Sequence, residues 1–339
     1  MDKQFKVAVV GATGAVGEAL LAILHERKFP AKEIVALASE KSAGKEVAFG
    51  RRKLIAQALE TYDFAGTDFA LFSAGAKVSA VHAPRAAAAG AVVVDNTSQF
   101  RYDDDVPLVV SEVNPHAIGG RPRGIIANPN CSTMQMLVAL APIHRAVGIE
   151  RINVATYQSV SGAGRSGLEE LGRQTAQLLN FQAIKPTKFP MQIAFNAIPQ
   201  IDDFQPNGYT REEMKVVWET RKILEAPTIQ VNPTAVRVPV FYGHSEAVHI
   251  ETREKITAEA ARALLEQAPG VVVVDERRPG GYPTPVTHAA GKDGVFVGRI
   301  REDISHPRGL DLWVVSDNLR KGAALNAVQI AELLAAERA

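Results

Sequence analysis

The single cysteine of the chain, Cys131, stands in NPNCSTMQM directly after Asn130, where an apolar periodic run begins. Asn is a good helix N-cap, and the positive end of a helix favours thiolate over thiol. A cysteine so placed can attack a carbonyl carbon, and the amides of the same turn could hold the resulting oxyanion. Because cysteine is also a common inert core residue, its position alone leaves both interpretations open.

A nucleophilic cysteine needs a group that exchanges protons near neutral pH, and histidine, with an unperturbed pKa of about 6.5, is suited to this. His244 lies in RVPVFYGHSEAV, seven residues after Arg237. In an uninterrupted strand these two side chains would point to opposite faces. Pro239 and Gly243 permit a break, so we predict one between Pro239 and His244. By itself, each of the chain's eight histidines would more often be structural.

A second kind of chemistry is indicated by Gly11, Gly14 and Gly17 in FKVAVVGATGAVGEALLAILHER, where a strand pattern turns into a helix pattern. Bare backbone at such a turn can approach a pyrophosphate, and the helix N-terminus faces its charge. The spacing is GxxGxxG rather than GxGxxG, and glycines here can also serve only tight packing. The strand–helix–strand context favours a dinucleotide site.

The end of the second strand reads Ala38, Ser39, Glu40, Lys41, Ser42. A carboxylate at this place would bind the ribose 2′-hydroxyl of NAD and repel a 2′-phosphate. Two hydroxyls and an ammonium suit the phosphate of NADP, provided that Glu40 points outward. We therefore expect NADP as the cofactor.

A chain of 339 residues exceeds the size at which one hydrophobic core usually stops growing, so we expect two domains to position these residues. After the first strand–helix–strand unit, which ends in EIVALASE, further strands are predicted in DFALFSAG, AVVVDNTS and RGIIANPN, with a helix in VSAVHAPRAAAAG. This alternation predicts an α/β domain with a Rossmann-type, doubly wound parallel sheet.

The pattern changes after Cys131. A helix is predicted in STMQMLVALAPIHRAV, and strands in RINVATYQSV, TAVRVPV and EAVHIETRE, which together read as α+β. The Gly/Pro-rich stretch at 277–285 reads as a surface loop. Near the C-terminus, Ala327, Ile330, Ala331 and Leu334 form one helical stripe, and we expect it to pack on the first domain.

Composition bounds the function. Hydrophobic residues make up 46% and charged residues 22%, and the formal net charge is +1. The composition is typical of a globular protein. A net charge this small produces no electrostatic field that would attract nucleic acid or an anionic membrane, so we expect a small-molecule site. One cysteine excludes an internal disulfide or a cysteine-based zinc cluster, and no metal site is indicated. With neither a signal-peptide pattern nor a run of roughly 18 apolar residues, we expect a cytoplasmic protein with no membrane role.

The motifs together resemble the aspartate-semialdehyde dehydrogenase family, and the resemblance covers nearly the whole chain. They are GATGAVG near the start, SAG at 73–75, DNTSQFR at 95–101, NPNCST at 128–133, YQSVSGAG at 157–164, EEMK at 212–215, RVPVFYGHSEAV at 237–248 and SDNLRKGAALNAVQIAE at 316–332. The resemblance implies an NADP-binding domain of residues 1–130 and 318–339, a catalytic and dimerisation domain of residues 131–317, and a homodimer.

The activity implied by the resemblance is the reversible NADPH-dependent reduction of L-aspartyl 4-phosphate to L-aspartate 4-semialdehyde. Phosphate is released and a cysteine thioester is the intermediate. The reaction belongs to amino-acid biosynthesis, toward lysine through diaminopimelate, and toward threonine and methionine. The family's cofactor-binding positions correspond to Gly11, Thr13, Gly14, Ala15, Val16, Ser39, Lys41, Ser42, Ser73, Gly75, Ser161, Gly162 and Asn318.

The resemblance also implies roles around the substrate. Cys131 is the acylated nucleophile, Gln158 orients the acyl intermediate and His244 is the acid/base. Arg237 pairs with the substrate carboxylate and Glu212 with its ammonium, whereas the phosphate is bound by Arg101 and Lys215, with Asn130 as a further contributor. Without the family, Glu212 and Lys215 would read as an ordinary i,i+3 helix pair.

Three other interpretations remain at this stage. N-acetyl-glutamyl-phosphate reductase shares the cysteine–histidine logic, but its acylated substrate has no ammonium for Glu212 to neutralise. A glyceraldehyde-phosphate dehydrogenase is more distant, because its nucleotide fingerprint and cysteine surroundings differ. A catalytically inactive, nucleotide-binding redox sensor would be supported by the loss of Cys131, Gln158, Arg237 or His244, and all four are present.

Overall fold

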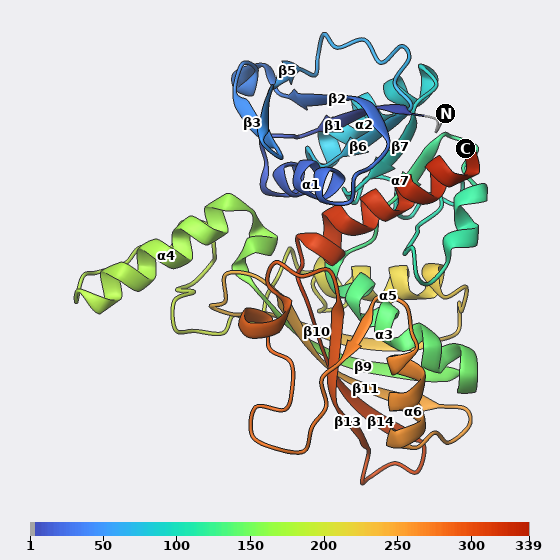
Figure 1. Ribbon diagram of the computed structural model, residues 1–339. Helices are drawn as coiled ribbons and strands as arrows, with labels where there is room; N and C mark the ends of the chain where they lie inside the picture. The colour runs from blue at the N-terminus through green and yellow to red at the C-terminus, as the bar shows by residue number, and fades with distance from the viewer. Residues whose placement is uncertain (1–3, 339) are drawn as a thin grey trace. The chain divides into compact units, whose positions relative to one another are not determined.

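The computed structural model describes residues 4–338 and divides into two compact units (Figure 1). One consists of the chain up to Pro129 together with the residues from Ala323 onward, and the other is Asn130–Gly322. Asn130 and residues 318–322 thus lie in the second unit, whereas the sequence-based division assigns them to the nucleotide domain. As a division of function, that assignment stays a prediction.

The first unit is built on a parallel sheet in the order β5-β2-β1-β6-β7-β8. The chain enters at the centre, builds outward to one side, and returns past β1 to build the other side. This confirms the predicted doubly wound sheet and makes a crevice at its carboxyl edge, where ligands bind in such folds. The strands are β1 (Phe5–Val10), β2 (Ala31–Ala38), β5 (Gln57–Ala58), β6 (Phe69–Phe72), β7 (Val92–Asp95) and β8 (Ile125–Ala127).

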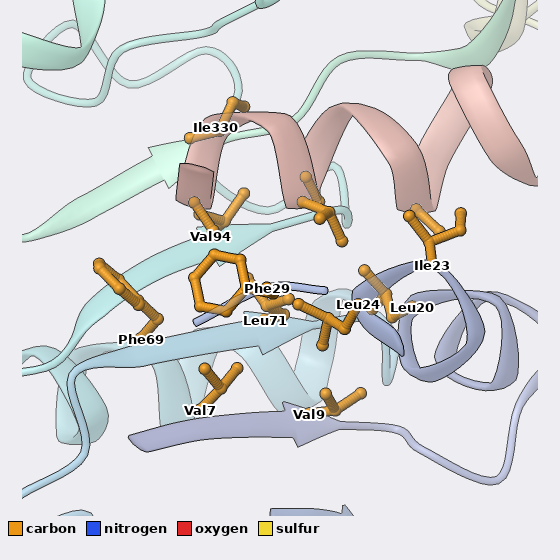
Figure 2. Close-up of a cluster of buried hydrophobic side chains, with 14 of the residues drawn as sticks. Val7, Val9, Leu20, Ile23, Leu24, Phe29, Phe69, Leu71, Val94 and Ile330 are labelled. Carbon is orange, nitrogen blue, oxygen red and sulfur yellow. The ribbon is translucent and has the colours of Figure 1, made fainter. Parts of the chain in front are cut away.

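Helices α1 (Ala15–Glu26) and α7 (Leu325–Arg338) pack side by side in one core with the sheet (Figure 2). Figure 2 shows Ile330 of α7 above Val94, and Leu20 and Leu24 of α1 beside Leu71. The predicted stripe of Ala327, Ile330, Ala331 and Leu334 is buried in this core, which confirms that the C-terminal helix packs on the first unit. Burying each large aliphatic side chain contributes about 1.5–3 kcal/mol. The remaining elements are the hairpin β3 (Glu46–Phe49) and β4 (Arg52–Ile55), helix α2 (Ala76–Ala88), and the short helices η1 (Glu40–Ser42) and η2 (Pro115–Gly119).

A buried amide network also ties α7 to the carboxyl edge of this sheet. The side chain of Asn326 donates to the Val109 carbonyl at 2.9 Å and to Asn128 Oδ1 at 2.6 Å. Asn128 Nδ2 in turn donates to the Ala323 carbonyl at 3.0 Å. Satisfied buried amides of this kind fix one arrangement, because an unpaired one costs about 1–3 kcal/mol.

The second unit has a mixed sheet in the order β10-β9-β11-β14-β13-β12. Helix α3 packs against β9, β11, β13 and β14, and also contacts α5 and α6. The α+β region and its three predicted strands, now β9, β10 and β11, are confirmed, as is the loop that fills most of 277–285. The strands are β9 (Ile149–Gln158), β10 (Gln230–Arg237), β11 (His244–Thr252), β12 (Val271–Val273), β13 (Val295–Glu302) and β14 (Gly309–Ser316). The helices are α3 (Cys131–Val147), α4 (Arg165–Leu179), α5 (Arg211–Ile223) and α6 (Ala258–Glu266), with the short helices η3 (Val160–Ala163) and η4 (Pro285–Ala289). The short helix η5 (Arg320–Ala324) begins in the second unit and ends in the first.

Between residues 4 and 338, no helix combines the length and the apolar character needed to cross a membrane.

Candidate active site

Cys131 is the first residue of α3, and the side chain of Asn130 caps that helix. Asn130 Oδ1 accepts the amide hydrogens of Ser132 at 3.0 Å and Thr133 at 3.2 Å. The predicted cap is confirmed. The idea that the amides of this turn hold an oxyanion is wrong for these two, because both already donate to the cap.

Two glutamates of α5 hold Asn130 in place. Glu219 Oε2 accepts from the Asn130 backbone amide at 2.6 Å, and Glu212 Oε1 accepts from its side-chain amide at 2.8 Å. The helix that presents these carboxylates is itself fixed by a capping box of Thr210 and Glu213. Glu219 was not predicted from the sequence as part of the site. Its position seven residues after Glu212, on the same helix face, was the available signal.

One edge of the second sheet brings three predicted site residues together. Arg237, the last residue of β10, is in register with Gln158, the last residue of β9. β11 begins at His244 on the other side of β9, where Ser245 pairs with Tyr157. Residues 238–243 lie outside both strands, and Gly243 takes a left-handed φ of 87°. The predicted break is therefore confirmed.

His244 is fully buried, and its Nδ1 faces Ser159. The Ser159 amide lies 3.1 Å from Nδ1 and can only donate, so Nδ1 accepts and the neutral ring carries its proton on Nε2. Burial, and secondarily Arg237, lower the pKa of His244 to about 3. The residue is thus a neutral imidazole at physiological pH. Nε2 has no hydrogen-bond partner within residues 4–338.

Glu212 is the hub of the site. Its Oε1 accepts from Gln158 Nε2 at 3.2 Å as well as from Asn130, and Lys215 Nζ lies 3.0 Å from its Oε2. Although burial raises the pKa of Glu212, Lys215 and the amide donors outweigh it and bring that pKa to about 2. Lys215 also pairs with Asp202 at 2.9 Å. The i,i+3 pair is therefore present, within the polar cluster around Cys131 rather than on a solvated face.

Arg237 is buried and donates from Nη1 to the Ser159 carbonyl at 2.7 Å. Burial lowers the pKa of Arg237, and the nearby Glu212 and Cys131 oppose that change. A guanidinium stripped of water beside these groups has a strong tendency to bind a further anion.

Arg101 belongs to the first unit, whereas the site residues described above belong to the second. It is buried there, and its Nη2 donates to the Asn96 carbonyl at 2.7 Å. The side-chain oxygen of Asn96 accepts a hydrogen bond from the side-chain amide of Asn128, which belongs to the amide network. Arg101 is thus held by the loop that follows β7.

A cavity of about 310 Å³ opens at the carboxyl edge of the first sheet. Of the predicted cofactor residues, Gly11, Thr13, Gly14, Ser39 and Ser73 line it, whereas Ala15, Val16, Lys41, Ser42 and Gly75 are not among its lining residues. The other residues that line the cavity were not predicted from the sequence, and they are Ala38, Leu59, Glu60, Ala74 and Val78.

The glycine turn beside this cavity lets helix α1 pack closely on it. A Cβ on Gly17 would lie 2.1 Å from the Gly11 carbonyl oxygen, and Gly11 itself has a φ of 86°. Gly14 caps α1 with no side-chain hydrogen bond, which leaves the first helical amides directed at a ligand.

The last three predicted cofactor residues lie in the second unit, next to His244. Asn318 Oδ1 accepts from Ser161 Oγ at 3.0 Å and from the Gly243 amide at 3.1 Å. A Cβ on Gly162 would lie 3.0 Å from Arg237 Nη1 and 3.3 Å from His244 Nε2. These residues therefore border the sheet edge that carries Arg237 and His244.

Space beside Cys131 depends on Gly322, because a Cβ there would lie 2.8 Å from the Cβ of Cys131. We expect Gly322→Ala to slow alkylation of Cys131 by iodoacetamide about tenfold, equivalent to about 1.4 kcal/mol of overpacking. Gly172→Ala on α4 is the matched control, since nothing lies within 4 Å of its added Cβ. Equal alkylation rates for the two variants would contradict the assigned crowding.

Comparison with known proteins bears on both units. Two family models match, the semialdehyde dehydrogenase NAD binding domain over residues 6–121 and the semialdehyde dehydrogenase dimerisation domain over residues 140–321. The aspartate-semialdehyde dehydrogenase of Legionella pneumophila is 61% identical over 339 residues, which cover 99% of this chain and 97% of the relative.

Solved structures agree with these matches. Aspartate semialdehyde dehydrogenase II from Vibrio cholerae, complexed with ASA, is 60% identical with a TM-score of 0.97, over 99% of both chains. The aspartate semialdehyde dehydrogenase of Candida albicans, solved with NADP, is 26% identical with a TM-score of 0.76, again over 99% of both chains.

Proposed function

This chain belongs to the semialdehyde dehydrogenase family, and from that premise we propose that it reduces L-aspartyl 4-phosphate to L-aspartate 4-semialdehyde with NADPH. The observation that carries the proposal is the placement of Cys131 at the capped start of α3, in the same unit as the edge formed by Arg237, Gln158 and His244. The relatives named aspartate-semialdehyde dehydrogenase support the choice of substrate.

Cys131 performs the covalent step. Its thiolate attacks the acyl carbon, a C–S bond forms, and the bond to the phosphate oxygen breaks, so that phosphate leaves with the bonding pair. Bound NADPH supplies the hydride that reduces the resulting thioester to the aldehyde and returns the thiolate. In the reverse direction Cys131 adds to the aldehyde, a hydride passes to NADP, and inorganic phosphate then attacks the thioester, so that the C–S bond breaks and the acyl phosphate leaves.

Two further residues act at the carbonyl oxygen. This oxygen becomes negative whenever the acyl carbon is tetrahedral, and preorganised donors stabilise it. His244 is suited to this because its neutral ring presents a proton on Nε2, while Ser159 occupies Nδ1. Gln158, anchored through its amide to Glu212 Oε1, orients the acyl group.

The charged side chains divide the substrate's three ionic groups among them. Arg237 binds the carboxylate as a fork, and Glu212 binds the ammonium. Lys215 and Arg101 bind the phosphate, with Asn130 contributing. For Lys215 this requires sharing its charge with Asp202 and Glu212, both already within 3.0 Å.

The first unit holds the cofactor. The glycine turn after β1 takes the pyrophosphate, and the residues after β2, including Ser39, Lys41 and Ser42, favour NADP over NAD. The Candida relative solved with NADP supports this choice. The other residues assigned to the cofactor are Gly11, Thr13, Gly14, Ala15, Val16, Ser73 and Gly75 in the first unit, and Ser161, Gly162 and Asn318 in the second.

The setting of the enzyme follows from the same premise. A match to the family's dimerisation domain supports a homodimer. The lone cysteine, which the reaction needs reduced, supports the cytoplasm as its location. The product then feeds amino-acid biosynthesis toward lysine, threonine and methionine.

Two parallel assays test the proposal. Purified protein is given NADP or NAD, phosphate, and either L-aspartate semialdehyde or N-acetyl-glutamate semialdehyde, and cofactor reduction is followed. We expect phosphate-dependent turnover with the free amine only, because the acetylated amine offers no ammonium for Glu212 to bind. Turnover only with the acetylated aldehyde would move the substrate to the N-acetyl-glutamyl class, and NADPH binding without turnover would indicate the redox-sensing alternative.

A further inference from the structure

Glu246 is a buried glutamate that the proposed reaction does not use. It lies two residues after His244 on β11, so the two side chains share a face of the sheet. Its cross-strand neighbours are Thr156 on β9 and Val314 on β14. Helix α3, which begins with Cys131, packs against all three strands. Glu246 is fully buried there.

The surroundings of Glu246 do not suit a negative charge. Neither of its carboxyl oxygens has a hydrogen-bond partner of normal geometry within residues 4–338. Another buried glutamate, Glu170, provides a contrast, because its carboxylate accepts from the Thr187 amide at 3.0 Å and the Lys188 amide at 2.6 Å. An ionised carboxylate needs such donors.

Gln135 links this glutamate to the two reacting residues. It lies four residues after Cys131 on α3, one turn along the same helix face. Its Nε2 donates to the His244 carbonyl at 3.4 Å, while its buried Oε1 has no partner within the described chain. Thr156, opposite Glu246 on β9, accepts from the Gln158 amide at 3.3 Å. The buried face under α3 thus contacts the His244 backbone and the Gln158 side chain, and it lies one helical turn from Cys131.

A protonated Glu246 would supply a hydrogen-bond donor to this buried face, where Gln135 Oε1 is an acceptor without a partner among the described residues. As a neutral acid it gains one O–H donor, and the unpartnered Oε1 of Gln135 is an acceptor on the adjoining helix. Burial raises the pKa of Glu246 well above its ordinary value, and Gln135 offsets this only in part, with no charged neighbour contributing.

We propose that Gln135 and the neutral acid form of Glu246 are positioning residues, which hold the His244 backbone at a fixed place relative to the helical turn that carries Cys131. The inference rests on the proposed function, since it concerns the same site. Neither residue touches substrate. They act by keeping the acid/base and the nucleophile in register, where a displacement of about 1 Å can cost about 100-fold in rate.

The first test separates positioning from stability. We expect Gln135→Leu to lower kcat at least about tenfold with KM for both substrates within about twofold. Alkylation of Cys131 should stay within about twofold of wild type, because the nucleophile itself is unchanged. Gln174→Leu, a buried glutamine of α4, is the matched control and should lower the melting temperature without lowering kcat. Gln135→Met serves if the leucine variant does not fold.

The second test concerns the state of Glu246. We expect Glu246→Gln to keep kcat within about threefold, since a carboxamide replaces a neutral acid, whereas Glu246→Leu should lower it as Gln135→Leu does. The double variant Gln135→Leu, Glu246→Leu should be no slower than either single variant, because one coupled unit is lost once. An infrared difference spectrum of wild type minus Glu246→Gln should show a protonated carboxyl stretch at pH 7.

The pH dependence of stability gives an independent readout. A raised folded-state pKa means that the contribution of Glu246 is fully present below its ordinary pKa of 4.5 and is lost as pH rises through its folded pKa. Glu246→Gln should remove that loss. Glu170, whose folded pKa is lowered because its amide and hydroxyl donors outweigh burial, has the opposite sign, so Glu170→Gln should lose stability at neutral pH.

Unchanged kcat in Gln135→Leu, or a loss fully explained by unfolding, would overturn the positioning role. So would an ionised Glu246 in the infrared spectrum. If wild type turns over neither aldehyde, the proposed function fails instead, and the spectrum and the stability profiles still decide the state of Glu246.

Discussion

Replacing Cys131 with alanine is expected to lower phosphate-dependent turnover by at least about 10⁴-fold, because no other group can form the acyl intermediate. NADP binding should be nearly unchanged, since the cavity at the first sheet edge does not include this residue. The measurements are kcat with L-aspartate semialdehyde and the dissociation constant for NADPH from fluorescence.

Ser132→Ala is the matched control for that variant. It changes the neighbouring small side chain of α3 but keeps the amide that donates to Asn130. We expect kcat within about threefold of wild type, as for substitutions outside special features. Residual turnover in Cys131→Ala above about a hundredth of wild type would rule out the thioester route.

The sequence predicted the fold because local signals agreed with one another. Short apolar runs alternating with an amphipathic helix specified the first sheet, and the stripe of Ile330 and Leu334 specified where the last helix packs. Asn130 was readable as a cap from its type and place alone. The break before His244 was predicted because Arg237 and His244 are seven residues apart, and Pro239 and Gly243 permit such a break.

Other parts of the site are invisible in the sequence because they depend on cross-strand register and on contacts between distant residues. Ser159 occupies Nδ1 of His244 across 85 positions of sequence, and no spacing rule connects them. Glu60 lines the dinucleotide cavity, although it lies well beyond the glycine turn. The burial that keeps His244 neutral is likewise a tertiary property.

The oxyanion prediction failed for two amides of the α3 turn for a related reason. Amides at a helix start are free donors only if the cap leaves them so, and the Asn130 side chain takes those of Ser132 and Thr133. A good cap and an oxyanion hole made of the same amides exclude each other. We therefore propose that His244 Nε2 stabilises the oxyanion, although the sequence had assigned His244 only to proton exchange.

Glu212→Gln is expected to lower kcat/KM for L-aspartate semialdehyde about 10²- to 10³-fold, or about 3–4 kcal/mol, the scale for breaking a buried ion pair. Glutamine can still accept at Oε1 from Asn130 and Gln158, but its NH₂ group would face Lys215 Nζ, donor against donor. Preference for the free amine over the N-acetyl aldehyde should fall with it, whereas Glu266→Gln on α6 should change neither kcat/KM nor this preference.

The lowered pKa of Glu212, about 2, gives stability that is present above about 4.5 and lost as pH falls toward 2. The free energy of unfolding of Glu212→Gln should therefore depend less on pH in the acid range than that of wild type. If selectivity for the free amine survives while kcat/KM falls, Glu212 organises Asn130 and Gln158 without reading the ammonium, and the substrate assignment must rest on other residues.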